Sequence, residues 1–587
     1  MYSDLKSYQI IIALLKKWNI RHCVLSAGSR NVPFVHSVEE DPFFKCYSVV
    51  DERSAGYFAL GLSQQIQEPV VISCTASTAS CNYWPPVAEA FYQGVPLVVL
   101  TSDRDAAMLG QWEDQMIDQV GMFDRHVRKS VNLPEVKDER DWIFCQRLVN
   151  EALLELNHHG TGPVHINIPM ESYSLSFKTK ELPEVTKIDR LDVFSSKNEW
   201  EDKLKRLQSC KRILVTCGQM SYVKPSLNDS LGEFFHTYDA SISVEHMGNV
   251  SCDGSINTSV CFETRYVTKE KFEELMPEIV ISYGNNITQG LKEMLRRFHG
   301  KFEHWLIQED GRPIDMYKSL TTIFECPVEY FFQQCNKFAQ GRKNSLVYHS
   351  LIKDYANTVT YPDFPYCSIY AIREIVTGIP SGSILQLAIN NSIRITNFFK
   401  LNPDVRTYAN IGTYGIDGCL STLIGQASLT DGLAFLVTGD LAFFYDMNAL
   451  RIKHVGNNVR ILMVNNEGGG EFYYNGTWRN ESSDLHTTAR HHTKAEGWVK
   501  ECGFQYIAVH DKKELLAAKE VFFNPSNERP VFMEVFTEMK DDAQKTIEFY
   551  SYSKPVSPVG MKGQVKKILK NALGDNTIKA IKNIVKN

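Results

Sequence analysis

Two segments near residues 440 and 466 carry residue types that suit a metal-bridged diphosphate. Asp440 ends the apolar run GLAFLVTGD, and Asn466 ends a second apolar run, RILMVNNEGGG. Carboxylate, amide and backbone carbonyl oxygens are the ligands that a hard cation prefers. Gly439 and the glycines at 468–470 allow the backbone to approach phosphates closely. These residues indicate a magnesium–diphosphate site, although two ordinary strand-to-helix turns would contain the same residue types.

Two further segments place charged residues just after β-rich runs. Glu52 opens an Ala/Gly/Leu-rich helical segment in VVDERSAGYFALGL, and Ser29 and Arg30 lie in the strand-to-loop stretch SAGSRNVPF. A glutamate there can serve as an acid or base, and Ser29 with Arg30 can meet an anion. The alternatives are an acidic first-turn residue that interacts with the helix dipole and a solvated arginine on a surface loop.

The elements that position these residues alternate between short apolar strands and helices. HCVLSAG, VVISCTAS, VPLVVLTSD and GPVHINIP are strands within 1–185, and the segments 195–345 and 360–550 repeat the alternation. This alternation is typical of parallel sheets wound with helices, in which ligands bind at the carboxyl ends of the strands. The charged, proline-containing stretch 178–192 is predicted to be a linker.

Composition narrows the class of protein. The 587 residues are 43% hydrophobic and 22% charged, and the formal net charge of -6 argues against nucleic-acid binding. No apolar run approaches the roughly 18 residues that a membrane span needs. The first 18 residues are predicted to form an amphipathic helix without a cleavage site. The 14 cysteines are scattered without CxxC pairs, which favours free thiols and a cytoplasmic enzyme.

The segment 554–587 differs from the rest of the chain. It carries eight lysines against one aspartate, and its apolar residues fall on one face of each of two short helical segments. This pattern predicts a basic amphipathic tail that binds an anionic membrane surface or a protein partner. Packing on the acidic body of the same chain and a solvated, disordered tail are the alternatives.

Taken together, these motifs resemble the thiamine diphosphate-dependent decarboxylases and carboligases. The closest likeness is to the menaquinone-pathway synthase family, which joins a succinyl unit from 2-oxoglutarate to isochorismate. The matching stretches include SAGSR, TASTASCNYWPPVAEAFYQGVPLVVLTSDR, DQMIDQVGMF, NIGTYGIDG, GDLAFFYDMNAL and VNNEGGG. The resemblance implies an α/β fold of three doubly wound parallel-sheet domains: pyrimidine-binding (1–185), middle (195–345) and diphosphate-binding (360–550).

The resemblance also implies roles for individual residues. Glu52 matches the glutamate that hydrogen-bonds N1′ of the cofactor's aminopyrimidine, and Gln115 matches a glutamine beside the reacting carbon. Ser392 matches a serine at the donor end of the substrate pocket. The residues implied to bind thiamine diphosphate and Mg²⁺ are Ile416, Gly439, Asp440, Asn466, Gly468 and Gly469, of which Asp440, Asn466 and the Gly468 carbonyl are the metal ligands. The resemblance further implies a homo-oligomer with active sites at the subunit interface.

Several substrate-binding positions depart from the family pattern. Arg30 is retained, but cationic residues are replaced by Leu109, Gly290, Leu291, Thr396 and Ile411. Each lost charge-assisted hydrogen bond weakens carboxylate binding by roughly 1.5–3 kcal/mol. Arg394 lies two residues from one expected position and could restore a single contact.

We therefore expect a decarboxylase or carboligase that cleaves a small 2-oxo acid and transfers the acyl unit to an acceptor other than isochorismate, such as a sugar derivative. Three alternatives remain open at this point. They are the menaquinone-pathway synthase activity itself, simple decarboxylation to an aldehyde without ligation, and an inactive, cofactor-binding scaffold.

Overall fold

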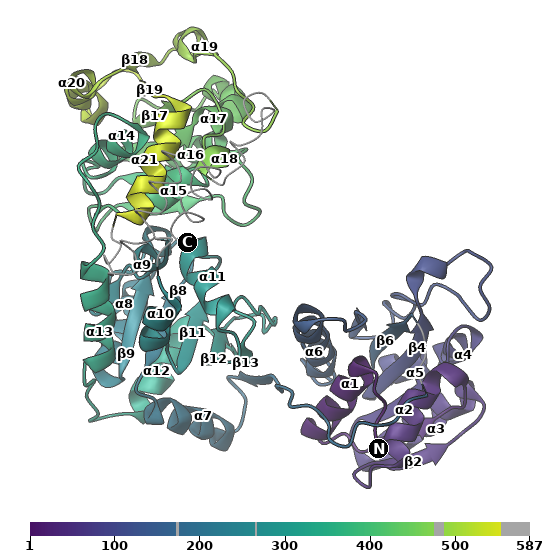
Figure 1. The fold of residues 1–587 in the computed structure, drawn as a ribbon. Helices are drawn as coiled ribbons and strands as arrows, with labels where there is room; N and C mark the ends of the chain where they lie inside the picture. The colour runs from purple at the N-terminus through teal and green to yellow at the C-terminus, as the bar shows by residue number, and fades with distance from the viewer. Residues whose placement is uncertain (172–174, 264–266, 475–485, 553–587) are drawn as a thin grey trace, which may run out of the picture. The chain divides into compact units, whose positions relative to one another are not determined.

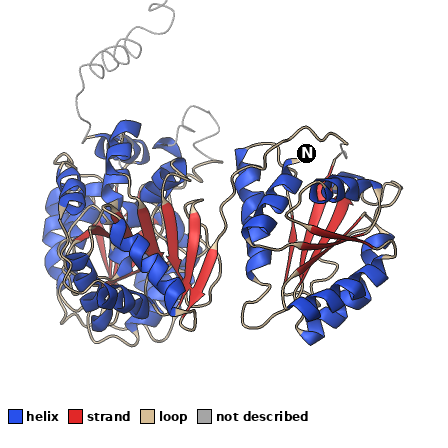
Figure 2. Ribbon diagram, turned by 90° about the horizontal axis from the view of Figure 1, so that it is seen from below, coloured by secondary structure: helices blue, strands red, loops and turns tan. Residues whose placement is uncertain are grey.

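The computed structural model describes residues 1–171, 175–263, 267–474 and 486–552, which form parallel sheets covered by helices (Figures 1 and 2). The chain divides into two compact units. One contains Met1–Lys203 and Glu303–Pro327, and the other contains Leu204–Phe302 and the described residues from Val328 onward. The predicted basic tail at 554–587 lies outside the described residues.

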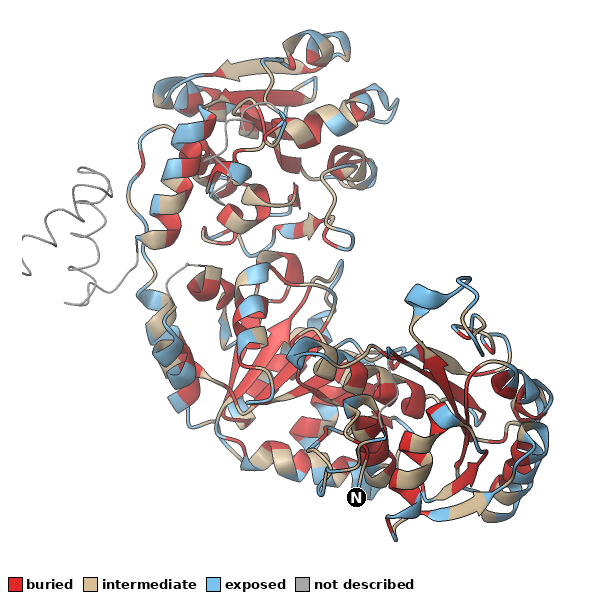
Figure 3. Ribbon diagram, turned by 45° about the vertical axis from the view of Figure 1, so that its right-hand side comes forward, coloured by how far each residue is buried: buried red, intermediate tan, exposed pale blue. Residues whose placement is uncertain are grey.

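The first sheet has the strand order β2-β1-β3-β4-β6-β5, and all of its strand pairs are parallel. Its strands are β1 (His22–Leu25), β2 (Lys45–Ser48), β3 (Val70–Cys74), β4 (Leu97–Arg104), β5 (Lys129–Asn132) and β6 (Val164–Met170). Its helices are α1 (Lys6–Lys17), α2 (Val32–Glu39), α3 (Glu52–Ile66), α4 (Thr78–Asn82), α5 (Trp84–Gln93) and α6 (Glu139–Leu154). Strand β3 is buried along its whole length, and β4 is buried except at its last residue, because helices cover both faces of the sheet (Figure 3).

The middle part of the chain contributes parallel strands to both units. In the first unit β12 (Glu303–Ile307), β13 (Leu320–Glu325) and β7 (Asp189–Asp192) lie side by side in that order. In the second unit the order is β10 (Ser255–Ile256), β9 (Ala240–Val244), β8 (Ile213–Cys217) and β11 (Ile279–Tyr283). The helices of this part are α7 (Lys197–Ser209), α8 (Pro225–Thr237), α9 (Ser259–Glu263), α10 (Lys269–Leu275), α11 (Gln289–Arg297) and α12 (Val328–Phe338).

Strand β7 lies inside the stretch that the sequence predicts to be a linker. Its four residues pair with β13, but only Leu191 among them is buried. An edge strand this short, with one inward-facing apolar residue, does not produce the alternating pattern that reveals a strand in sequence. The linker prediction is therefore wrong for the last four residues of the stretch.

The third sheet has the order β15-β14-β16-β17-β19-β18, again with parallel pairs throughout. Its strands are β14 (Ile384–Leu387), β15 (Arg406–Ala409), β16 (Ala434–Gly439), β17 (Val459–Asn465), β18 (Gln505–Val509) and β19 (Val531–Phe536). Its helices are α14 (Ser368–Val376), α15 (Asn391–Thr396), α16 (Cys419–Ala427), α17 (Asp440–Asp446), α18 (Glu471–Tyr474), α19 (Glu496–Glu501), α20 (Lys512–Phe523) and α21 (Met539–Ser551). The helix before them, α13 (Val347–Asn357), packs instead on β9, α9 and α10 of the middle part. Numbered from its own first strand, this order is the same as that of the first sheet. The predicted α/β class with parallel sheets is confirmed.

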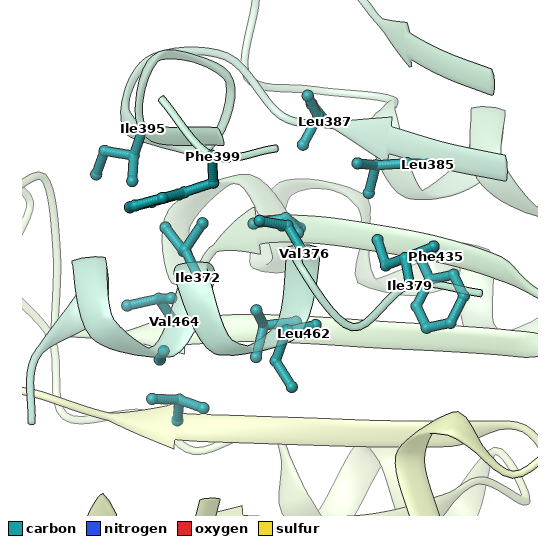
Figure 4. Packing of buried hydrophobic residues seen from close by; sticks show 14 of the residues in the cluster. Ile372, Val376, Ile379, Leu385, Leu387, Ile395, Phe399, Phe435, Leu462 and Val464 are labelled. Atoms are coloured by element: carbon teal, nitrogen blue, oxygen red, sulfur yellow. The ribbon is translucent and has the colours of Figure 1, made fainter. Parts of the chain in front are cut away.

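A dense apolar core holds α14 on the third sheet. Ile372 and Val376 of α14 belong to the same buried cluster as Leu462 and Val464 of β17 (Figure 4). Ile372 and Val376 are four residues apart, so they lie on the same face of the helix. Burial of each such side chain contributes roughly 1.5–3 kcal/mol. This packing fixes the sheet edge at which β14, β16 and β17 end.

Within the described residues, no helix is both long enough and apolar enough to cross a membrane. All 14 cysteines are free, and most of them are buried. The predicted N-terminal amphipathic helix is α1, whose isoleucines and leucines are buried in the core of the first unit.

A buried histidine in β6 gives the first unit a specific pH dependence. His165 is fully buried, with Nε2 2.8 Å from Thr101 Oγ1 and Nδ1 2.9 Å from Ser130 Oγ. Thr101 donates its hydroxyl proton to Asn167 Oδ1, so its oxygen accepts from Nε2–H and Nδ1 accepts from Ser130. Burial lowers the pKa of His165 from 6.5 to about 3, so the folded unit holds this imidazole neutral.

We expect the unfolding free energy of the first unit to fall more steeply with acid in the wild type than in a His165→Gln variant. Below pH 6.5 the unfolded chain binds a proton at this histidine and the folded chain does not, so acid favours unfolding. The excess slope approaches about 1.4 kcal/mol per pH unit and ends near pH 3. Urea unfolding of the first unit, followed at several pH values between 7 and 4, measures this slope. The exposed His454→Gln variant is the control, and equal slopes in all three proteins would contradict the assignment.

Candidate cofactor-binding site

A cavity of about 270 Å³ lies at the carboxyl ends of β14, β16 and β17 in the second unit. It is at the point where the strand order of the third sheet reverses, which is where open α/β sheets bind ligands. Every residue of the predicted diphosphate site lines this cavity, as does Ser392: Ile416, Gly439, Asp440, Asn466, Gly468 and Gly469. The structure therefore brings together residues that are up to 77 positions apart in the sequence.

Asp440 is the first residue of α17 and is nearly fully buried, at 2% exposure. The Gly468 N–H donates to its Oδ2 at 2.9 Å, and the Leu441 N–H donates to its Oδ1 at 2.6 Å. His491 Nε2 lies 3.5 Å from the same Oδ2, and this interaction raises the pKa of His491. A buried carboxylate with these contacts keeps lone pairs for a cation, as a metal ligand requires.

The loop after β17 has a backbone that few residue types could adopt. Gly468 has φ +143, and a Cβ atom there would lie 2.7 Å from the Thr488 carbonyl oxygen. Glu467 also has a positive φ of 67°, as does Asn390 on the opposite side of the cavity, with 61°. Strained backbone of this kind clusters at ligand sites because the surrounding structure enforces it. Glycine at 468 is required both by conformation and by space.

Asn466 is oriented by a residue that the sequence did not point to. Its Nδ2 donates to Asp542 Oδ2 at 3.2 Å, and Thr537 also donates to that oxygen at 2.6 Å. Burial raises the pKa of Asp542, while hydrogen bonds from Ser368 and Thr537 act against this increase. Because the amide nitrogen is engaged, the amide oxygen of Asn466 is the atom available to a cation. Carboxylate, amide and carbonyl oxygens thus form a donor set that fits Mg²⁺.

Arg394 lies beside the cavity on α15. Its side chain is 12% exposed, Nη1 lies 3.3 Å from Oε1 of the cavity-lining Glu471, and Nη2 donates to Gln289 Oε1 at 3.1 Å. The guanidinium of Arg394 is therefore held close to the predicted cofactor pocket.

Ile416 is partly buried and lines the same cavity. It packs on the core formed by α16 and its neighbours.

In the first unit, Glu52 is the first residue of α3, just beyond the carboxyl end of β2. The N-terminus of α3 is capped by Asp51, whose Oδ1 accepts from the Ser54 N–H at 2.8 Å, so Glu52 is not needed as a cap. Burial raises the pKa of Cys74 well above its usual range, and the negative charge of Glu52 raises it further. The half-buried Glu52 carboxylate therefore lies near a dry, apolar region.

Close packing fixes the orientation of α3. A Cβ atom at Gly56 would lie 2.3 Å from Pro86 Cγ of α5, so only glycine lets the two helices approach this closely. Ala55 and Ala59 on the same helix are fully buried. Small residues one turn after Glu52 thus hold the start of the helix in place.

Arg30 and Ser29 follow β1 and differ in exposure. Arg30 is only 7% exposed, whereas Ser29 is exposed. The positive charge of Arg30 helps to lower the pKa of Asp103, although burial dominates and raises it. Arg30 is therefore a buried cation, and the alternative of a solvated arginine on a surface loop is excluded.

Gln115 lies in the segment between β4 and β5, with an exposed side chain and φ +53. Its neighbour Asp114 is also exposed. The fully buried glutamine of this segment is instead Gln119, which donates to Asn167 Oδ1 at 3.0 Å and accepts from the Ser77 N–H at 2.7 Å. Gln119 anchors the segment, and Gln115 extends from it.

Most of the residues that replace cations of the family pattern are packed inside the protein. Leu291, Thr396 and Ile411 are buried at 0–1% exposure, and Leu109 is exposed. A side chain at Gly290 would collide with the backbone of Glu263, because a Cβ there would lie 2.5 Å from the Glu263 nitrogen.

Lys292, one residue after Leu291, is a buried cation that the sequence reasoning overlooked. It is 8% exposed and donates to Asn286 Oδ1 at 2.7 Å, and burial lowers its pKa. Lys292 thus lies one residue after Leu291, and Arg394 lies two residues before Thr396. Both are cations close in sequence to positions at which the family pattern has a cation and this chain does not.

The parallel-sheet fold, together with the family match and the relatives given next, makes this chain a thiamine diphosphate-dependent enzyme. Residues 5–122 match the family described as thiamine pyrophosphate enzyme, N-terminal TPP binding domain. Over 94% of its length the chain is 40% identical to 2-succinyl-5-enolpyruvyl-6-hydroxy-3-cyclohexene-1-carboxylate synthase of Bacteroides thetaiotaomicron, 99% of which is covered. The synthases of Phocaeicola vulgatus (40% identical, 99% covered) and Flavobacterium psychrophilum (32%, 97% covered) are also similar. The chain belongs to this synthase family.

These relatives overturn the expectation that the chain uses an acceptor other than isochorismate. Identity of 40% over nearly the whole of both chains favours the synthase activity that was one of the alternatives. The expectation failed because it compared cationic residues position by position. Lys292 and Arg394 lie just outside those positions, and both are held in place by neighbouring side chains.

Proposed function

We propose that this protein is a 2-succinyl-5-enolpyruvyl-6-hydroxy-3-cyclohexene-1-carboxylate synthase that joins the succinyl unit of 2-oxoglutarate to isochorismate. The observation that carries the proposal is the 40% identity to synthases of that name over 94% of the chain. The reaction uses thiamine diphosphate and Mg²⁺, with Asp440, Asn466 and the Gly468 carbonyl as metal ligands. When bound, the cofactor supplies the carbon atom that attacks the 2-oxo acid and stabilises the negative charge left by loss of CO₂.

The residues of the chain hold the cofactor and control its protons. Glu52 would hold the aminopyrimidine of the cofactor through a hydrogen bond, and a half-buried carboxylate can both accept and return a proton there. Ile416 would support the cofactor by apolar contact, since it lines the cavity. Gly439 and Gly469 leave room for the diphosphate, and Asp542 orients Asn466 toward the cation.

Both substrates carry carboxylates, and buried cations are the groups that bind them. Arg30, Arg394 and Lys292 supply three such cations at 7%, 12% and 8% exposure. A partly desolvated guanidinium forms stronger, bidentate hydrogen bonds to a carboxylate than a solvated one. Ser392 and Gln115 complete the substrate contacts, with Ser392 at the donor end of the cavity.

The holoenzyme is expected to convert isochorismate and 2-oxoglutarate to the succinylated product with release of one CO₂. Pyruvate in place of 2-oxoglutarate is expected to lower kcat/KM by about 10- to 150-fold, because it lacks the distal carboxylate and its charge-assisted hydrogen bonds. Mass spectrometry of the product with each donor measures this, with Glu52→Gln holoenzyme as the control. Turnover of another acceptor, with no product from isochorismate, would refute the proposal.

We propose further that the active form is at least a dimer, with Glu52 of one chain and Asp440 of another in the same site. Helix α3, which begins at Glu52, leaves Tyr57 and Phe58 each 44% exposed, and Val50 just before it is 76% exposed. An apolar surface beside a catalytic residue suits burial against a second copy of the chain.

Co-expression of Glu52→Gln and Asp440→Ala chains is expected to restore part of the activity that each lacks alone. In a mixed dimer one of the two sites receives both wild-type residues, so about a quarter of the wild-type activity is the statistical expectation when half of the dimers are mixed. Differently tagged chains, purified in sequence on both tags, isolate the mixed dimer. No activity in that purified species would place Glu52 and Asp440 in a site within one chain.

A further inference from the structure

A cluster of two histidines and a glutamate lies in the first unit, in a part that supplies none of the site residues described above. His158 and His159 follow α6, and Glu325 ends β13, 167 residues from His158. His158 Nε2 lies 3.0 Å from Glu325 Oε2, and His159 Nε2 lies 2.5 Å from Glu325 Oε1. One ligand atom from each of the three residues lies within 4.8 Å of the others.

The surroundings hold this cluster in a fixed geometry. Glu325 is 6% exposed, and a Cβ atom at Gly311 would lie 2.4 Å from its Oε2, so the loop before β13 covers the carboxylate. Arg128 donates to the backbone carbonyl of Glu155 at 3.1 Å and to that of His158, which fixes the turn after α6. The site is therefore built by the fold and does not depend on flexible surface side chains.

Both ring nitrogens of His158 lie against carboxylates, and this arrangement needs a cation. Its Nδ1 lies 2.9 Å from Glu155 Oε2, and its Nε2 lies 3.0 Å from Glu325 Oε2, so both ring nitrogens face carboxylate oxygens. A neutral imidazole has only one N–H, so either tautomer leaves a lone pair facing an acceptor. A second proton or a metal ion relieves that repulsion. Glu155 is held by Arg190, whose Nη2 lies 2.9 Å from Oε1, and hydrogen bonds from Arg190 and His158 lower the pKa of Glu155 despite its burial.

The contact between His158 Nδ1 and Glu155 is of the kind that orients a metal-binding histidine. A carboxylate that accepts from Nδ1–H fixes the tautomer and aims the Nε2 lone pair at the metal. Two imidazoles and one carboxylate suit Zn²⁺, and imidazole ligands disfavour Mg²⁺. With bonds of about 2.0–2.1 Å, tetrahedral ligand atoms lie about 3.3 Å apart, so Glu325 needs to separate from each histidine by less than about 1 Å. Ligand atoms that lie farther apart than this, up to 4.8 Å, need to move closer. His159, whose side chain is 68% exposed, can turn to allow this.

We propose that His158, His159 and Glu325 form a Zn²⁺ site that ties the end of α6 to the end of β13. The exposure of His159 leaves a fourth position open to water. The site is separate from the predicted Mg²⁺ ligands, which belong to the second unit. Because the metal would bind the folded chain and join segments far apart in sequence, its occupancy would stabilise the first unit.

The test is calorimetric titration of Zn²⁺ into the full chain, stripped of metals and then saturated with thiamine diphosphate and Mg²⁺. One Zn²⁺ per chain is expected to bind the wild type, and Co²⁺ is expected to give the visible absorption of a four-coordinate site. His159→Asn is the first variant, because asparagine tolerates the φ of +50° at this position. Glu325→Gln is the second, because it keeps the shape beneath Gly311. Each is expected to weaken Zn²⁺ binding at least tenfold.

The control is His236→Asn, which removes an exposed histidine that lies 3.0 Å from Asp253 but that belongs to no group of three such ligands among the described residues. It is expected to bind Zn²⁺ as the wild type does. Melting temperatures with EDTA and with Zn²⁺ show whether each variant is folded and whether Zn²⁺ raises the wild-type value. Equal Zn²⁺ affinity in the wild type and His159→Asn, or no Zn²⁺ bound by the wild type at micromolar concentrations, would overturn the proposal.

Discussion

Replacement of Glu52 by glutamine is expected to lower activity by about 10²–10⁴-fold while thiamine diphosphate still binds. The amide has nearly the same shape as the carboxylate, and the α3 N-terminus keeps its cap because Asp51 supplies it. Gly56, Ala55 and Ala59 hold the helix independently of the residue at 52. The loss is therefore chemical, since an amide cannot share the N1′ proton as a carboxylate does.

Proton exchange at C2 of the bound cofactor, followed by NMR in deuterated buffer, measures this step directly. Glu68→Gln, which changes an exposed glutamate of the same unit, is the matched control and is expected to exchange at the wild-type rate. A Glu52→Gln variant that exchanges C2–H as fast as the wild type would show that another group performs the proton transfer.

Replacement of Asp440 by alanine is expected to abolish cofactor binding instead. The change removes a carboxylate that is 2% exposed and that accepts from the Gly468 N–H, so the cavity loses a metal ligand and a hydrogen bond that holds its glycine loop. Asp440 would be one of the residues that hold Mg²⁺, and without the metal a diphosphate would lack charge compensation. We expect at least a 100-fold weaker affinity, about 2.7 kcal/mol.

Calorimetric titration of thiamine diphosphate in the presence of Mg²⁺ decides this point. Asp431→Ala, at an exposed position before β16, is the control and is expected to bind normally. The melting temperature of each variant without cofactor shows whether the fold is retained. Unchanged affinity in a folded Asp440→Ala chain would mean that the cation binds elsewhere.

The sequence predicted the parallel sheets and the main cavity because both depend on local patterns. Apolar runs that end in Gly, Asp or Asn mark the carboxyl ends of parallel strands, and Asp440 and Asn466 lie at two such ends that are adjacent in the sheet. Neighbouring strands bring their ends together whatever the loops between them contain. This reasoning needs no knowledge of distant contacts.

The residues that the sequence did not reveal act through long-range contacts. Asp542 reaches Asn466 across 76 positions, and His491 approaches Asp440 from a loop with no strand-end pattern. Lys292 was overlooked because matching by position assumes a fixed register, whereas a helix can present a cation from the next residue along. The sequence could show that charges were missing at particular positions, but not that Lys292 is buried beside one of them.

The identical strand order of the first and third sheets has an evolutionary consequence. Two copies of one architecture within a single chain are what duplication and fusion of an ancestral gene produce. Each copy has its own point where the strand order reverses, so the residues at the two sheet edges were free to diverge. The loops of the third sheet now line a cavity with Asp440 and Asn466, whereas α3 of the first sheet begins with Glu52. One topology can thus carry different residue sets in two parts of a single chain.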